Sequence, residues 1–259
     1  MKKHLRNAPL PFILMAVASF FILVIVDAIG DDNLPSAVAS ILMVFVSFVV
    51  SALAIWMVAR DGLMRNDRFL MVNTHLAVSL LIFAISEVAG IVLNQLGELS
   101  QVILLAGVVQ LVAVGLVAEG MMEYLLSTNQ VLEFAKSRYA IPLLVLVVTS
   151  FFVVVQGGFL IISSQVYPLG LVLSIPLEIG LTIVAISMII LLRYYRGGFL
   201  VIPMLLTILG TLLLLARTLL WGFQLMELLN PTSQIIAGAG YLLLGAALSF
   251  KSEEMAKVD

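Results

Sequence analysis

Five polar side chains interrupt segments of the chain that are otherwise strongly apolar. They are Glu87, Gln110, Gln156, Glu178 and Arg217, and each lies within a different apolar run. Counting about 1.5 Å of rise per helical residue places all five at roughly 10–17 Å from the same end of their helices. Because ionisable residues inside a membrane are rare and mark functional sites, this shared depth predicts one buried site for a ligand or an ion.

The guanidinium group of Arg217 cannot readily lose its charge, so it needs a partner or a contact with water in an apolar surrounding. We expect Glu87 to be that partner, with Glu178 as the alternative or a second one. A carboxylate left over in a low dielectric tends to hold its proton, as a proton-coupled carrier or a cation site would require. The alternative interpretation is an ion pair that only fixes the packing of helices.

A second polar group lies nearer the other end of the apolar runs and consists of His75, Glu119 and Glu123. Glu119 and Glu123 are four residues apart and share one helix face. A histidine with two carboxylates could bind a divalent metal or continue a polar path across the membrane. Glu123 is more simply explained as a solvated side chain near Lys136 or Arg138, so we predict no metal, no cofactor and no catalytic residue.

The elements that must position these residues are membrane-spanning helices. Of the 259 residues, 63% are hydrophobic and only 11% are charged, against about 25% charged residues in soluble domains. A bilayer core about 30 Å thick requires about 20 apolar residues per helix. This predicts an all-α multi-pass membrane protein with eight spans: 9–29, 36–59, 70–95, 101–126, 140–162, 170–192, 199–228 and 234–250.

The distribution of charge predicts the orientation of these spans. Twelve of the 13 Lys and Arg residues fall on one side under the eight-span topology, and Arg217 is the exception. Because cytoplasmic loops collect Lys and Arg, we expect both termini on the cytoplasmic side of the cell membrane. The net charge of −2 leaves no basic patch for nucleic acid, and the lack of cysteine excludes disulfides and thiolate chemistry.

Two pairs of segments indicate an internal duplication. "PFILMAVASFF" (11–21) resembles "PLLVLVVTSFF" (142–152), and "LGELSQVILLAG" (96–107) matches "LNPTSQIIAGAG" (229–240) at six of 12 positions. The offsets of 131 and 133 residues overlay all four spans of one half on those of the other. We therefore predict a 4+4 parallel repeat, residues 1–130 and 131–259, in one membrane domain; the alternative is coincidence between apolar sequences.

The sequence leaves three classes of function open. The first is a small carrier or channel for an ion or a small polar solute, built around Arg217 and the carboxylates. The second is a membrane sensor or interaction subunit that receives a ligand or a lipid from the outer side and contacts a cytoplasmic partner. The third is an intramembrane enzyme that modifies lipids, since paired carboxylates can act as acid and base. Membrane lipid is an expected partner in each case, and a homo-oligomer or a membrane partner is compatible with all three.

Overall fold

The structure is a computed structural model that describes residues 34–61, 68–95, 99–132, 139–162, 168–195, 200–222 and 231–249, together with Phe12, Leu14, Met15, Ala18 and Phe21. The described ranges contain seven helices: α2 (Leu34–Asp61), α3 (Arg68–Gln95), α4 (Leu99–Leu132), α5 (Ala140–Ile162), α6 (Pro168–Tyr194), α7 (Val201–Gly222) and α8 (Pro231–Leu248). Each contains a stretch of 18 to 27 residues that is apolar enough to cross a membrane. The fold is thus all-helical, as predicted.

Seven of the eight predicted spans match these helices to within a few residues, except at two ends. The first predicted span, 9–29, lies outside the described residues apart from five helical positions. The prediction that 127–139 is a connection is wrong over 127–132, because α4 continues to Leu132. Ser127 donates a hydrogen bond to the carbonyl of Tyr124, so a polar residue is satisfied within the helix after the apolar sequence ends. Predicted residues 223–228 of the seventh span lie outside the described residues.

The bundle has an apolar exterior and a partly polar interior. Large apolar side chains stand on the outside, for example Ile41 and Val154, whose exposed fractions are 69% and 70%. Buried side chains include a Glu, a Gln and an Arg, at Glu178, Gln156 and Arg217. Extended apolar surface is rare on soluble monomers, so this distribution is that of a multi-pass membrane protein, in which lipid covers the outside.

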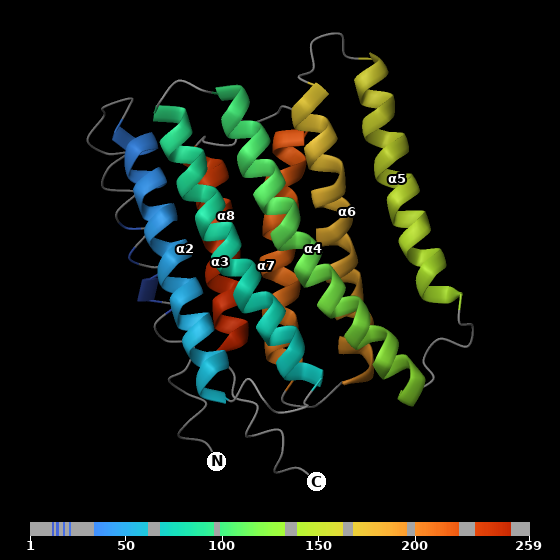
Figure 1. The fold of residues 1–259 in the computed structure, drawn as a ribbon. Coiled ribbons are helices and arrows are strands. Elements are labelled where there is room, and N and C mark those ends of the chain that lie inside the picture. Colours follow the sequence, from blue (N-terminus) through green and yellow to red (C-terminus); the bar gives the residue numbers. More distant parts are fainter. Residues whose placement is uncertain are drawn as a thin grey trace.

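Six of the described helices form a closed ring of contacts, and α5 lies outside this ring. Helix α2 packs against α3 and α8, α3 packs against α4, α4 against α6, α6 against α7, and α7 against α8. Helix α5 packs extensively only against α6 among the described helices, and Figure 1 shows it at the edge of the bundle beside α6. The interior of the ring is therefore the place where polar side chains from different helices can meet.

Glycine residues let the helices of the ring approach closely. A Cβ atom on Gly210 would lie 2.9 Å from the carbonyl oxygen of Gly240, and one on Gly240 would lie 3.1 Å from the carbonyl oxygen of Gly210. A Cβ atom on Gly180 of α6 would collide with the side chain of Val114 of α4. Small residues at such contacts are typical of helix packing in membranes. The close contact of α7 with α8 holds Arg217 against the residues of α8 described next.

Candidate functional site

An ion pair between Arg217 of α7 and Glu87 of α3 lies at the centre of the candidate site. Nη1 of Arg217 donates to Oε1 of Glu87 at 2.5 Å, and Nη2 donates to Oε2 at 3.0 Å. The side chains are only 4% and 3% exposed. This confirms the expected pairing of Arg217 with Glu87. Parallel, charge-assisted bonds of this kind fix the relative position of both groups, so the pair links two helices that do not pack extensively on each other.

Two residues of α8 form further hydrogen bonds with this ion pair. The hydroxyl of Tyr241 donates to Oε1 of Glu87 at 2.9 Å, and Nε of Arg217 donates to Oγ of Ser233 at 3.3 Å. The ring of Tyr241 also contacts the ring of Phe83, with centroids 5.5 Å apart. Neither of these two α8 residues was expected at the site from the sequence. They lie eight residues apart, two turns of one helix face, and a buried Tyr among small residues needs a partner for its hydroxyl, which is the signal that could have identified them.

An internal cavity adjoins the ion pair. The space that the centre of a water molecule can occupy there is about 10 Å³, which is about enough for one water. Arg217, Gln110, Thr218 and Tyr241 are among the residues that line it. Nε2 of Gln110 is buried and has no hydrogen-bond partner among the described residues. Because buried polar atoms are nearly always paired, this amide is suited to bind a polar molecule that enters the cavity.

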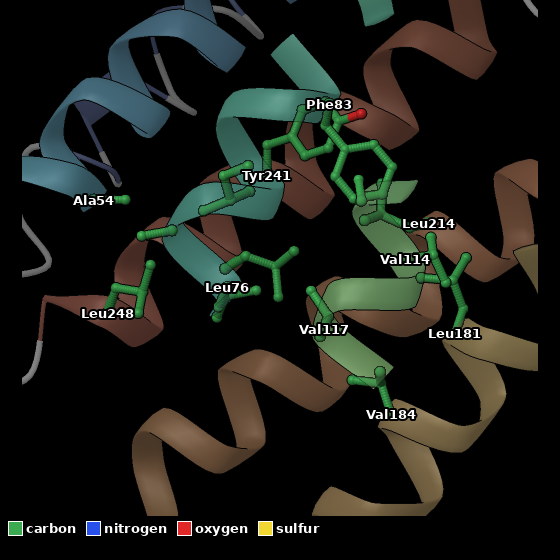
Figure 2. Close-up of a cluster of buried hydrophobic side chains, with 14 of the residues drawn as sticks. Ala54, Leu76, Phe83, Val114, Val117, Leu181, Val184, Leu214, Tyr241 and Leu248 are labelled. Atoms are coloured by element: carbon green, nitrogen blue, oxygen red, sulfur yellow. The ribbon is translucent and has the colours of Figure 1, made fainter. Parts of the chain in front are cut away.

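A second cavity of about 10 Å³ lies next to the first and is lined in part by Ser79 and Thr211. Oγ of Ser79 is also buried without a hydrogen-bond partner in the described part of the chain. Four apolar residues line both cavities and are called the apolar layer below: Phe83, Val114, Leu181 and Leu214. Figure 2 shows these residues close together in the core, contributed by α3, α4, α6 and α7. The two cavities therefore share an apolar boundary within the ring.

Glu178 and Gln156, predicted to share the site of Arg217, belong to a separate cluster between α5 and α6. Nε2 of Gln156 donates to Oε2 of Glu178, and Oγ of Ser174 donates to Oε1 of Gln156 at 3.3 Å. The alternative that Glu178 pairs with Arg217 is thus not observed. The neighbouring residue Leu177 lines the first cavity, and adjacent residues of a helix point about 100° apart, so Glu178 faces α5 instead.

The predicted secondary group does not converge on one point. His75 is half-buried and packs against Gly120 of α4, where a Cβ atom would lie 3.0 Å from the imidazole ring. Glu119 and Glu123 are exposed on the outside of α4. They therefore do not extend the polar interior of the ring, because the α4 residue that packs against His75 of α3 at this level is Gly120. No cluster of three or more His, Asp or Glu that could hold a metal occurs within the described ranges.

Replacing Tyr241 by Phe tests the hydrogen bond to Glu87. We expect the free energy of unfolding to fall by about 1–2 kcal/mol, because the carboxylate loses one donor while remaining buried. Equilibrium denaturation in mixed micelles measures this change. In a background with Glu87 replaced by Leu, the same substitution has no acceptor to lose and is expected to cost little. An equal cost in both backgrounds would contradict a contribution of this bond.

Comparisons with family models, with curated proteins and with solved structures gave no match to this chain. A functional conclusion must therefore come from the chemistry of the site. The structure brings together Arg217, Glu87, Tyr241 and Ser233, places Gln110 at the adjoining cavity, and separates Glu178 and Gln156 from them. The chain is a bundle of apolar helices typical of a multi-pass membrane protein, with a buried ion pair beside a water-sized cavity.

Proposed function

We propose that this protein is a small carrier or channel that moves an ion or a small polar solute through the ring of helices. The observation that carries this proposal is the cavity beside Arg217, into whose wall Gln110 brings an amide without a partner. A pair that served packing alone would need neither an adjoining space nor a spare hydrogen-bond donor. The solute would contact Gln110 and the guanidinium group of Arg217.

The guanidinium group has hydrogen-bonding capacity left for a solute. Arginine carries five N–H donors, and three of them make the bonds to Glu87 and Ser233. The hydroxyl of Tyr241 is also within reach of the guanidinium group, and an N–H group that is not used in these contacts can bind a carbonyl, hydroxyl or anionic oxygen in the cavity. Glu87 neutralises most of the charge of Arg217, so a neutral polar solute or a weakly bound anion suits the site better than a cation does.

The apolar layer explains why the path is closed in this conformation. Phe83, Val114, Leu181 and Leu214 stand between the polar atoms of the first cavity and Ser79 in the second. Passage requires that these side chains move apart, and apolar constrictions close such paths by excluding water. In the described conformation, these side chains therefore separate the proposed solute site from the second cavity.

The packing of the helices supports the proposed 4+4 repeat. At the offset of 133 residues, α2, α3 and α4 correspond to α6, α7 and α8. The contact of α2 with α3 has a counterpart in that of α6 with α7, and the contact of α2 with α8 has one in that of α6 with α4. Such a pattern suits a parallel repeat in one membrane domain, residues 1–130 and 131–259, with both termini cytoplasmic. Under this arrangement Arg217 and Glu87 form an asymmetric site between similar halves.

Replacing Gln110 by Leu separates transport from packing. Because Nε2 of Gln110 has no partner among the described residues, we expect the variant to be as stable as the wild type or more stable. A lost hydrogen bond to a charged or strongly polar solute is worth about 1.5–3 kcal/mol, so flux should fall by about tenfold to a hundredfold. The measurement is uptake by liposomes containing the purified chain, with chloride, inorganic phosphate, potassium and glycerol as probes.

The matched control is Leu212→Ala, a change on the lipid-facing side of α7 where the leucine is 42% exposed. It should leave the flux unchanged. Wild-type liposomes that pass none of the four probes faster than empty liposomes would count against the proposal. So would a Gln110→Leu variant with wild-type flux.

One observation favours the second function, that of an interaction subunit. Glu119 and Glu123 are exposed on the outside of α4 and lie within its apolar span Leu104–Gln130. A carboxylate that faces lipid is unfavourable, and a membrane partner or a second copy of the chain could supply a hydrogen-bond donor. Cross-linking from a photoreactive residue at position 115 in intact membranes tests this: a defined adduct that disappears in Glu119→Leu supports a partner on this face.

A further inference from the structure

Three polar residues form a stripe along α6 that the proposed transport site does not use. Ser174, Glu178 and Thr182 follow one another at intervals of four residues, which places them on one face of the helix at successive turns. Gln156 of α5 meets this stripe through its hydrogen bonds with Glu178 and Ser174. The α5–α6 contact, otherwise apolar, therefore contains a small polar cluster with one carboxyl group.

Only one of the two carboxyl oxygens of Glu178 has a hydrogen-bond partner among the described residues. Its side chain is 0% exposed, Oε2 accepts the bond from Gln156, and Oε1 is buried without a hydrogen-bond partner among the described residues. One turn further along, Oγ1 of Thr182 is also buried and unpartnered. An ionised carboxylate accepts about four hydrogen bonds when it can, so a single donor leaves most of its charge unsolvated.

No described positive charge compensates Glu178. Three helices pack against α6: α4, α5 and α7. Helix α5 contains no charged residue, α4 offers only the exposed Glu119 and Glu123 among its described side chains, and α7 offers Arg217, whose charge Glu87 already neutralises. Arg193, at the other end of α6, is 15 residues away, or about 22 Å along the helix. An unpaired charge in such a place is strongly unfavourable.

We propose that Glu178 is a proton-binding site. While α5 packs closely on α6, the side chain of Glu178 is a neutral carboxylic acid. A hard cation requires six or more oxygen ligands, and the stripe offers only two unpartnered oxygen atoms, Oε1 of Glu178 and Oγ1 of Thr182. A proton needs no such shell. On binding, a hydronium ion transfers its proton to one carboxylate oxygen, so that one of its O–H bonds breaks, the O–H bond of the acid forms and a water molecule remains.

Release of this proton requires a water molecule that accepts it and hydrogen-bond donors that solvate the carboxylate left behind. Helix α5 is the element that can admit it, because among the described helices it packs extensively only against α6. Proton release is thereby tied to a movement of α5 away from the stripe. The proton site itself does not depend on transport at Arg217, although a carrier with both sites could couple the two movements.

Infrared spectroscopy of the full chain in lipid nanodiscs at neutral pH tests the proposal. A protonated carboxylic acid has a C=O stretching band that a carboxylate lacks, and the band shifts on hydrogen–deuterium exchange. We expect the wild type to show such a band and Glu178→Gln to lose it. Glu119→Gln, a change of an exposed carboxyl group, should retain it. Flux is not part of this readout, so the result stands apart from the success or failure of the transport assay.

A second variant keeps the test valid if Glu178→Gln does not fold. Glu178→Asp retains an acid in the same place, and its shorter side chain changes the hydrogen bond from Gln156, so the band should move in frequency rather than vanish. A spectrum at neutral pH without any protonated carboxyl band would overturn the proposal. A band that is the same in the wild type and in both Glu178 variants would overturn it as well.

Discussion

Replacing Arg217 by Met is expected to lower the free energy of unfolding by about 3–5 kcal/mol. The loss comes chiefly from Glu87, which stays buried at 3% exposure without the guanidinium group that binds its carboxyl group. Glu87→Gln should cost a similar amount, because the guanidinium group of Arg217 then lacks its counter-ion. Denaturation of the purified chain in mixed micelles, followed by tryptophan fluorescence or by circular dichroism, measures both values.

The double variant Arg217→Met with Glu87→Met should recover most of this loss. Removing both charges together leaves no unpaired ion, and such replacements by apolar residues of similar volume are often neutral or stabilising. The double-mutant cycle therefore should give a coupling energy of about 3 kcal/mol or more. Leu212→Met, an apolar change on the exposed side of the same helix, serves as the control and should stay within about 0.5 kcal/mol of the wild type.

The same double variant decides between the two interpretations of the ion pair. If the pair binds a solute, the variant is folded and stable but its flux falls to that of empty liposomes. If the pair serves only the packing of α3, α7 and α8, stability and flux recover together. A double variant that transports as the wild type does would therefore remove Arg217 and Glu87 from the proposed transport site.

Gly210→Ala and Gly240→Ala are expected to destabilise the protein by about 1–3 kcal/mol each, although alanine favours a helix by about 1 kcal/mol over glycine. The new methyl group on residue 210 would meet the carbonyl oxygen of Gly240 and Cγ of Leu244, both at 2.9 Å. On residue 240 it would meet the carbonyl oxygen of Gly210 at 3.1 Å and Leu214 at the same distance. Backbone atoms cannot turn aside as a flexible side chain can, so α7 and α8 must separate.

Gly115→Ala provides the matched control for these substitutions. It lies in the middle of α4, and a Cβ atom there would have no heavy atom within 4 Å. The higher helix propensity of alanine should therefore determine the outcome, and the free energy of unfolding should stay unchanged or rise by up to about 1 kcal/mol. Thermal unfolding of the three variants in one detergent gives the comparison. Equal stability of all three would show that α7 and α8 do not need their close backbone contact.

The depth of each polar side chain along its helix could be predicted from the sequence, whereas the direction in which the side chain points around the helix axis could not. Charges are so scarce in the apolar spans that the level of Glu87 and Arg217, found by counting residues, made the two side chains candidates for a contact. Counting gave Glu178 a similar level, yet its side chain points to α5 and bonds with Gln156. The expectation that Glu119 could continue a polar path has the same weakness, since Glu119 lies on the exposed side of α4. The direction of a side chain depends on how each helix is rotated against its neighbours, and apolar residues on all sides conceal that rotation.

The participation of α8 in the site illustrates a different limit. Ser233 and Tyr241 are uncharged, and such residues are common enough in membrane helices that composition does not single them out. Their role arises because the glycines at positions 210 and 240 bring α7 and α8 close together. The contact of α7 with α8 depends on residues that have no side chain, so the only sign of it in the sequence is the glycines themselves.

The separation of Glu87 and Arg217 by 130 residues has a consequence for biosynthesis. A ribosome adds about 5–20 residues per second, so roughly 10 s pass between the synthesis of the carboxyl group and that of the guanidinium group. During this interval α3 must enter the bilayer with Glu87 unpaired, and a lone acid within lipid is costly. We therefore expect the nascent first half to be accessible to membrane chaperones and quality-control proteases until α7 is inserted.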